Sequence, residues 1–292
     1  MCQSNRTLHG KTAIVTGANC GIGKTTAFEL AKRGARVILA CRDVNKANQA
    51  AADILKSFKN ADLIVKHLDL ASLASVRKFA EGIITEEKHL DILVNNAAVF
   101  GCPKSSTEDG FENHFAVNHL GPFLLTNLLL DLLKSSAPSR VVIVSSGLAK
   151  RGKVEFDNLN GERDYTKRYP NTKLMNNLFA RELHHVLNGE SKEVKSGVGV
   201  HCLHPGVVNT SLGRYMIPYY LKPLAIPLMY LLLKTPTEGC QTTLYCSIAE
   251  ELDNVSGCYY GNCKQEPWGE ASNDMAVARK LWEHSEKLVG LN

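Results

Sequence analysis

The sequence lacks the features that mark several special classes of protein. Its 292 residues contain no internal repeat and no low-complexity tract, which excludes a repeat array. The net charge of +5 comes without a dense block of Lys and Arg, so nothing indicates a nucleic-acid partner, although the mild excess is compatible with an anionic cofactor. No signal peptide is expected, because strand-like sequence begins by Thr12. A chain of this length suits one large α/β domain or two small ones.

The nine cysteines form no CxxC pair and no regular framework. An odd number in a chain of this size predicts reduced thiols in a reducing compartment, and hence a cytoplasmic or peripherally membrane-associated protein. Cys20 and Cys41 are expected to have packing roles. No metal site is predicted.

The sequence also has no clear transmembrane span. Residues Met216 to Leu233 are strongly apolar but carry Pro218, Pro223 and Pro227, which interrupt helix formation. Two compatible interpretations remain open. The segment at about 211–236 is either a lid over an apolar substrate pocket or a surface that contacts a membrane.

The most informative stretch runs from Lys11 to Arg42 and predicts a strand, a glycine-rich turn, a helix and a second strand. The apolar run Ala13–Val15 is followed at once by three glycines, and apolar residues then recur at helical spacing up to Gly34, which suits a helix C-terminus. Such a turn lets the backbone approach a pyrophosphate, which the helix N-terminus attracts. The alternative is a glycine-rich loop without a ligand. The glycines are Gly17, Gly21 and Gly23.

Strands and helices alternate along the rest of the chain, which predicts a mostly parallel sheet with helices on both faces. One long helix is expected from Asp109 to Leu133, bent at Pro122. Asp43 and Ser72 are expected to cap helices. With Val37–Ala40, the remaining strands predicted are Leu63–Val65, Ile92–Val94, Arg140–Val144, Val198–Leu203 and a short edge strand at Cys258–Gly261.

Polar residues follow several of these strands, where a parallel sheet binds its ligands. Asp69 follows the third strand, and Asn95, Asn96, Ala97 and Ala98 follow the fourth. A further polar residue, Asn118, lies inside the long predicted helix. Because Asn is a poor helix former, some other demand is expected to hold it there.

Tyr169 and Lys173 are one helical turn apart and therefore share a helix face. An ammonium beside a phenol favours the phenolate, so the pKa of Tyr169 is expected to fall below its reference of about 10. That suits a general acid/base, with Ser146 holding the reacting oxygen. Pro170 predicts a helix start or kink close to Tyr169. An isolated pair of this kind also arises by chance.

Several motifs in register show that the chain resembles the short-chain dehydrogenase/reductase family over roughly residues 8 to 265, and most closely the retinol dehydrogenase branch. The fold class implied is α/β, a single doubly wound Rossmann domain over residues 1–292 with a seven-stranded sheet. The motifs are Thr16-Gly17 with Gly21 and Gly23, Asp69, Asn95-Asn96-Ala97, Asn118, Ser146, Tyr169 with Lys173, and Pro205-Gly206, together with the branch-like strings Ala40-Cys41-Arg42-Asp43, Val117 to Gly121, Val144-Ser145-Ser146 and His204 to Val208.

The resemblance implies hydride transfer between a nicotinamide cofactor and an alcohol/carbonyl pair. It implies that Tyr169 donates the proton, Lys173 binds the nicotinamide ribose, Ser146 orients the substrate oxygen and Asn118 positions a water. It also implies a cofactor site in which Asp69 with Leu70 meets the adenine and Asn96 the adenosine-side ribose. The full set is Gly17, Asn19, Cys20, Gly21, Ile22, Gly23, Arg42, Asp69, Leu70, Asn96, Ala97, Tyr169, Lys173, Pro205, Gly206, Val208 and Thr210.

Arg42, at the end of the second predicted strand, favours NADP(H) over NAD(H), because an Arg there accommodates a 2′-phosphate. Two positions depart from the family pattern. Cys20 stands where some NADP-preferring relatives carry a second basic residue, and Ala98 stands where the family usually has Gly. An Ala at position 98 would be strained if its φ were positive. The predicted substrate is a small apolar alcohol, aldehyde or ketone, foremost retinol/retinal, with a steroid or lipid aldehyde as the alternative and a non-catalytic scaffold as a minor one. The family also implies a homo-oligomer, often assembled through the helices that carry Asn118 and Tyr169.

Overall fold

The computed structural model describes residues 1–161, 163, 166–209 and 233–291. Thr210 and most of the predicted lid at 211–236 lie outside these residues. So does nearly all of the predicted membrane contact between Met216 and Leu233.

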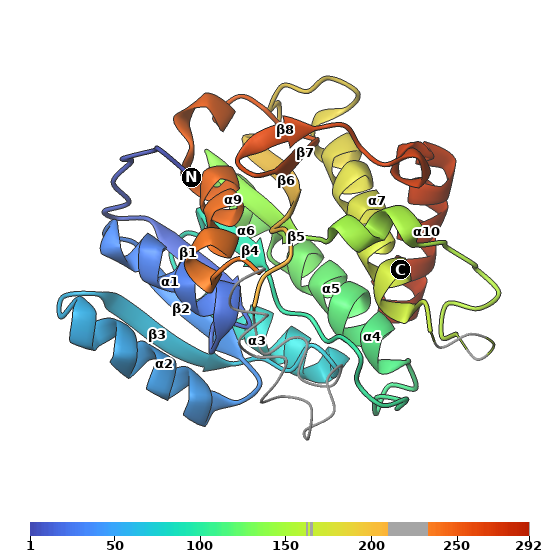
Figure 1. Cartoon of the computed structure of the whole chain (residues 1–292), viewed down its shortest axis with the longest axis horizontal. Helices are drawn as coiled ribbons and strands as arrows, with labels where there is room; N and C mark the ends of the chain where they lie inside the picture. The colour runs from blue at the N-terminus through green and yellow to red at the C-terminus, as the bar shows by residue number, and fades with distance from the viewer. Residues whose placement is uncertain (162, 164–165, 210–232, 292) are drawn as a thin grey trace.

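The strands form one eight-stranded sheet in the order β3-β2-β1-β4-β5-β6-β7-β8, as Figure 1 shows. All pairs are parallel except β7 and β8. The strand order reverses between β1 and β4, which is where doubly wound sheets bind ligands. The strands are β1 (Thr12–Thr16), β2 (Arg36–Cys41), β3 (Asp62–His67), β4 (Ile92–Asn95), β5 (Ser139–Val144), β6 (Val198–His204), β7 (Cys258–Gly261) and β8 (Lys264–Glu266).

The predicted α/β class is confirmed, but the count of seven strands is wrong. Cys258–Gly261 is not the edge strand, because β8 pairs antiparallel outside it. Asn262 and Cys263 join β7 to β8, and both have positive φ (51° and 58°), as a two-residue hairpin turn requires. A three-residue polar strand carries too little periodicity for sequence reasoning to find it.

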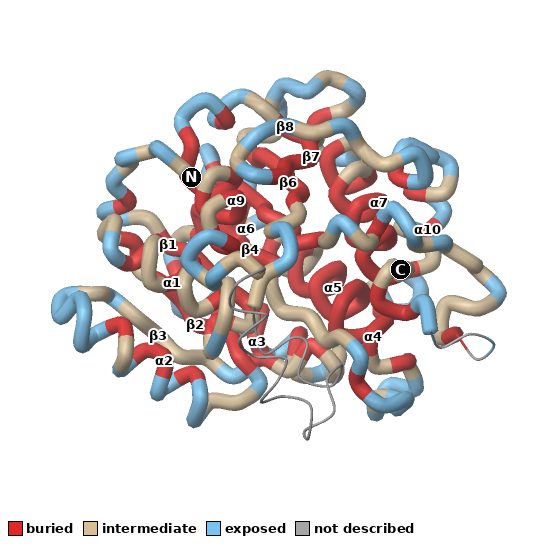
Figure 2. Tube along the Cα trace, in the orientation of Figure 1, coloured by how far each residue is buried: buried red, intermediate tan, exposed pale blue. Residues whose placement is uncertain are grey.

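Helices cover both faces of the sheet, and a hydrophobic core lies between the sheet and the helices on each face. One core unites the strands with α1, α2 and α9, and the other unites them with α3, α5, α7 and α10. Buried segments therefore run through the sheet and along the inner faces of the helices (Figure 2). The helices are α1 (Gly21–Lys32), α2 (Val44–Ser57), α3 (Leu73–Glu86), α4 (Asn113–Phe115), α5 (Gly121–Leu128), α6 (Leu130–Ser135), α7 (Arg168–Asn188), α9 (Pro236–Ile248) and α10 (Met275–Val289).

Two predicted helix caps are confirmed. The Asp43 side chain accepts the Lys46 N–H at 3.0 Å, and the Ser72 hydroxyl accepts the Ser75 N–H at 3.2 Å. Among the described helices, none combines the length and the apolar character that crossing a bilayer requires.

The predicted single α-helix from Asp109 to Leu133 is wrong in its start and its regularity, because the segment begins at Asn113 and consists of α4, a π-helical turn at Ala116–Leu120, α5 and α6. Leu120 and Gly121 keep αR dihedrals, so the helical path runs on into α5, where Pro122 stands in the first turn; a bend at Pro122 stays a prediction. The Gly121 N–H reaches back to the Ala116 carbonyl, which widens the preceding turn.

The C-terminal helix α10 packs along α7 and touches α5 (Figure 1). Its Trp282 ring lies 5.0 Å from the ring of Phe123 on α5 and 5.9 Å from that of Phe179 on α7. The faces of α5 and α7 beneath α10 are therefore already covered within the chain. A partner subunit could use those faces only by displacing α10.

Candidate active site

The glycine-rich turn connects β1 to α1, and its backbone leaves no room for a side chain at Gly17 or Gly23. Gly17 has φ +66°, and a Cβ on Gly23 would lie 2.4 Å from the Gly17 carbonyl oxygen. The N-cap residue of α1, Cys20, makes no side-chain cap, and the first turn holds no acidic residue. The N–H groups at this helix start suit a phosphate, so the turn fits a dinucleotide. The expected packing role for Cys20 is wrong, because its side chain is exposed, whereas Cys41 is buried.

Asn96 and Ala97 are tied to the end of β1. The Thr16 hydroxyl accepts both the Asn96 and the Ala97 N–H at 3.0 Å, and the Asn96 carboxamide donates to the Thr16 carbonyl at 2.8 Å. These bonds hold the ends of β1 and β4 together at the point where the strand order reverses. Ala98 follows without strain, since it is not among the residues with positive φ.

Ser146, Tyr169 and Lys173 meet above the carboxyl ends of β5 and β6. Helix α7 begins at Arg168, so Pro170 falls in its first turn, as predicted. Ser146 caps the short 3-10 turn after β5 and hydrogen bonds with Tyr169. The Lys173 Nζ donates to the Val144 carbonyl at 2.8 Å and lies 5.6 Å from the centre of the Tyr169 ring. The three predicted residues are thus brought together.

The expected lowering of the Tyr169 pKa is wrong for this structure. Burial raises the pKa of Tyr169 to about 12, against the weaker effect of its hydrogen bond with Ser146. Burial also lowers the pKa of Lys173 to about 8. The Lys173 ammonium donates to the Val144 carbonyl, and loss of water contact is the largest cause of both pKa shifts.

Asn118 stands in the π-helical turn and is fully buried. Its carboxamide accepts the Val99 N–H at 2.7 Å and donates to the Val99 carbonyl at 3.0 Å and the Thr172 hydroxyl at 3.1 Å. The demand that holds an Asn here is therefore a clamp between the segment after β4 and helix α7. That its backbone or side chain also positions a water stays a prediction.

Phe100 was missed by the sequence reasoning. Its ring lies 4.2 Å from the Tyr169 ring, tilted by 36°, and it is half-buried. Tyr169 is left 7% exposed. Phe100 therefore forms one wall beside the phenol. It lies in an irregular segment without periodicity, so no sequence signal marked it.

The segment after β6 packs against α9, and the same position of α9 also contacts the start of α1 after the glycine-rich turn. A Cβ on Gly239 of α9 would lie 2.7 Å from Val208 and 3.3 Å from Ile22. Gly206 has φ +83°, and the Lys234 side chain lies over it. This places Val208 beside Ile22 of α1, and the cofactor-binding role of Pro205, Gly206 and Val208 stays a prediction.

Two short segments run side by side below this edge. Val208 pairs in parallel with Lys234, the Lys234 N–H donates to the Val207 carbonyl at 3.0 Å, and the Asn209 N–H donates to the Lys234 carbonyl at 2.9 Å. The Lys234 ammonium adds a bond to the Asn262 carboxamide oxygen at 2.7 Å. Residues 205–209 and 233–235 are thereby fastened together.

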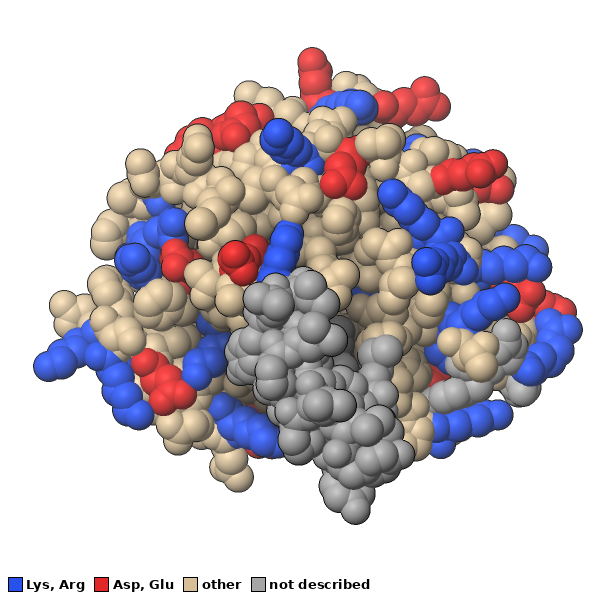
Figure 3. Space-filling model, viewed as in Figure 1, with Lys and Arg blue, Asp and Glu red and all other residues tan. Residues whose placement is uncertain are grey.

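The predicted adenosine side lies at the ends of β2 and β3. Arg42 is exposed directly after β2. Lys and Arg side chains are interspersed with Asp and Glu over the face of the molecule that Figure 3 shows. Asp69 accepts the Ala71 N–H at 3.0 Å and is half-buried, whereas the Leu70 side chain is buried in the core. Asn19 is half-buried within the glycine-rich turn.

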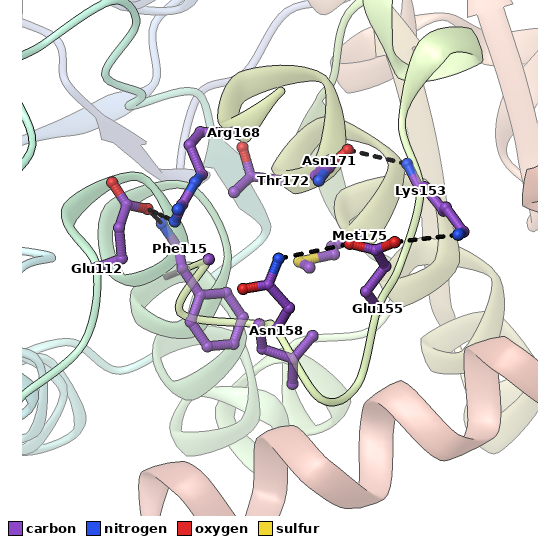
Figure 4. Close-up of a pocket in the computed structure, with 11 residues that line it drawn as sticks. Glu112, Phe115, Lys153, Glu155, Asn158, Arg168, Asn171, Thr172 and Met175 are labelled. Carbon is purple, nitrogen blue, oxygen red and sulfur yellow. Dashed lines mark hydrogen bonds and ion pairs between the residues drawn. The ribbon is translucent and has the colours of Figure 1, made fainter. Parts of the chain in front are cut away.

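A separate polar pocket lies beside the start of α7 (Figure 4). Its walls include Glu112, Lys153, Glu155 and Arg168, but not Ser146, Tyr169 or Lys173. We therefore do not assign it to the reacting groups.

Comparison with known proteins agrees with this geometry. Residues 11–218 match the short chain dehydrogenase family. The chain is 50% identical to human retinol dehydrogenase 14, over 97% of this chain and 88% of that protein. It is 47% identical to bovine dehydrogenase/reductase SDR family member 13, over 99% and 76% of the two chains. The crystal structure of an uncharacterized protein from Mycobacterium paratuberculosis matches with a TM-score of 0.76 and 33% identity, covering 98% of this chain and 95% of that one.

Proposed function

The chain belongs to the short-chain dehydrogenase family of oxidoreductases, and on that premise we propose that it transfers a hydride between NADP(H) and an apolar alcohol/carbonyl pair. The observation that carries the proposal is the meeting of Ser146, Tyr169 and Lys173 at the sheet edge that also bears the glycine-rich turn. When bound, the nicotinamide supplies or accepts the hydride, and the protein supplies orientation and the proton.

Each residue then has a defined task. The turn Gly17–Gly23 and the start of α1 hold the pyrophosphate, because no side chain caps the first N–H groups of α1. Ser146 orients the substrate oxygen, and Tyr169 gives it a proton. The raised pKa of Tyr169 keeps its proton in place at neutral pH, which suits carbonyl reduction. Lys173, which donates to the Val144 carbonyl here, would bind the nicotinamide ribose.

The preference for NADP(H) rests on the contrast between Arg42 and Asp43. Among the described residues, Arg42 has no ion-pair partner and is exposed. The Asp43 carboxylate, by contrast, caps α2 and pairs with Lys46 at 2.8 Å. Asp43 is thus occupied, whereas Arg42 is available to a 2′-phosphate.

For the substrate we favour retinol/retinal. Its support is the likeness to retinol dehydrogenase 14 and the aromatic wall that Phe100 builds beside Tyr169. A steroid or a lipid aldehyde on the same scaffold is the alternative. A panel of hydrophobic aldehydes and ketones, each run with NADPH and NADH, separates these substrates.

The decisive test is Tyr169→Phe, with Tyr245→Phe on α9 as the matched control. Tyr169→Phe should bind NADPH like the unaltered protein but lose turnover by roughly 100-fold or more, because the proton donor is gone. Tyr245→Phe should keep turnover. Undiminished activity in Tyr169→Phe would overturn the assignment of the general acid. NADPH binding by the unaltered protein without turnover of any carbonyl would instead support a non-catalytic scaffold.

A further inference from the structure

Residues around Tyr169 form a closed circuit of contacts that the proposed hydride transfer leaves unexplained. The Thr172 hydroxyl donates to the Tyr169 carbonyl at 3.0 Å and accepts an N–H of the Asn118 carboxamide at 3.1 Å. The same carboxamide binds both backbone polar groups of Val99. Phe100 follows Val99, and its ring lies 4.2 Å from the Tyr169 ring. The circuit therefore starts and ends at the residue that is proposed to donate the proton.

The circuit fixes Phe100 through the backbone of its chain neighbour. Because Asn118 bonds to both the N–H and the carbonyl of Val99, the chain just before Phe100 is held in one orientation. Asn118 and Thr172 are 0% and 2% exposed, so water does not compete for these bonds. Phe100 itself belongs to no helix or strand. The placement of its ring beside the phenol therefore depends on this clamp.

Phe100 can act on a substrate because part of its ring stays exposed. The residue is half-buried, and its ring is tilted by 36° against that of Tyr169. A substrate carbonyl that takes a proton from Tyr169 brings its neighbouring carbons close to this wall. A flat, conjugated chain makes closer contact with an aromatic face than a saturated chain does, since tetrahedral carbons project out of one plane.

We propose that Phe100 is the specificity-determining residue of the site, favouring substrates whose carbonyl is conjugated to a carbon–carbon double bond, and that Thr172 is the positioning residue that holds Phe100 there through Asn118. This inference rests on the proposed function, because it requires that Tyr169 meets the substrate carbonyl. Thr172 acts only through the hydrogen bonds of its hydroxyl. Its effect on substrate choice should therefore disappear when the Phe100 ring is removed.

A matched pair of aldehydes isolates the effect of conjugation. Geranial and citronellal differ only in the double bond next to the carbonyl, and the measured quantity is the ratio of their kcat/KM values with NADPH. Their different intrinsic reactivity cancels when the ratio of a variant is compared with that of the unaltered protein. A merely structural loss of active enzyme lowers both values by the same factor and leaves the ratio unchanged.

Three variants test the two roles. Phe100→Leu should lower the ratio of geranial to citronellal by roughly 3- to 10-fold, because Leu keeps apolar bulk but lacks the flat ring. Thr172→Val should lower it by roughly 2- to 5-fold, because Val has the shape of Thr without the hydroxyl. Thr172→Ser keeps the hydroxyl and should restore the ratio. An unchanged ratio in Phe100→Leu overturns the specificity role, and an unchanged ratio in Thr172→Val overturns the positioning role.

The double variant shows whether Thr172 acts through Phe100. Thr172→Val added to Phe100→Leu should change the ratio no further, whereas two independent effects would multiply and overturn the positioning role. Thr243→Val on α9 is the control, since Thr243 is also buried and its hydroxyl has no hydrogen-bond partner within the described parts of the chain. This control should keep both its turnover and its ratio. A ratio that falls as far in Thr243→Val as in Thr172→Val also overturns the positioning role.

Failure of the proposed function remains distinguishable from failure of this inference. If the unaltered protein turns over no hydrophobic aldehyde or ketone, the proposed function fails. If it does not turn over geranial and citronellal, calorimetric binding of geraniol and citronellol in the presence of NADP⁺ decides the specificity role. The unaltered protein should bind geraniol more tightly by roughly threefold or more, and Phe100→Leu should lose that preference. Equal binding of the two alcohols by the unaltered protein, or binding of neither, overturns the inference.

Discussion

Replacing Lys173 with Met should stabilise the folded protein at pH 7 while it abolishes turnover. The Lys173 side chain is 2% exposed, and burial lowers its pKa from 10.5 to about 8. That difference corresponds to a penalty of roughly 3 kcal/mol for folding with a charged ammonium. Loss of the hydrogen bond to Val144 destabilises the variant by roughly 1–2 kcal/mol, so its free energy of unfolding is expected to rise by about 1–2 kcal/mol in total. Met has a similar unbranched shape and can occupy the same slot.

The gain should depend on pH with a definite sign. Between about pH 8 and 10.5 the unfolded chain holds the Lys173 proton and the folded protein does not, so stability of the unaltered protein rises with pH in that window. The penalty is fully present at neutral pH and mostly gone near pH 9.5. Lys173→Met should therefore lose its advantage there.

Urea unfolding at pH 7 and pH 9.5 measures both effects. Lys134→Met, at an exposed lysine of α6, is the control and should change the free energy of unfolding by less than about 0.5 kcal/mol. If Lys173→Met is less stable than the unaltered protein by the same amount at both pH values, the ammonium is not an uncompensated buried charge, and our account of the site electrostatics fails.

Three further predictions concern the cofactor site and the core. Gly23→Ala should abolish NADPH binding in a fluorescence titration, because its Cβ would lie 2.4 Å from the Gly17 carbonyl oxygen; normal binding would show that the turn does not meet the cofactor. Arg42→Ala should raise the KM for NADPH by roughly 10- to 100-fold and leave that for NADH unchanged, and equal effects on both would refute 2′-phosphate recognition. Phe123→Ala should cost roughly 3–5 kcal/mol in urea unfolding, whereas Phe58→Ala at the α2 terminus should cost far less; similar costs would contradict the packing of α10 against α5.

The alternation of strands and helices and the position of the glycine-rich turn could be predicted from the sequence. Apolar runs such as Ala13–Val15 and caps such as Asp43 and Ser72 are local signals, and local signals decide these elements. The meeting of Ser146, Tyr169 and Lys173 followed from the resemblance, since their sequence separation alone does not bring Ser146 to α7.

What could not be predicted depends on contacts between distant segments. The Asp109–Leu133 region has helical periodicity throughout, but the clamp from Asn118 to Val99 and Thr172 selects a π-helical turn in its middle. The pKa of Tyr169 was expected to fall because Lys173 is one turn away. Its rise reflects burial, which sequence spacing does not reveal.

The fastening of residues 205–209 to residues 233–235 has a consequence for engineering. The chain leaves this junction and returns to it at neighbouring points, and main-chain atoms make most of the bonds there. The register of the join is therefore set mainly by the backbone of the two segments. Exchange of the Val207 and Asn209 side chains should leave these segments joined in the same register, so both positions are open to redesign.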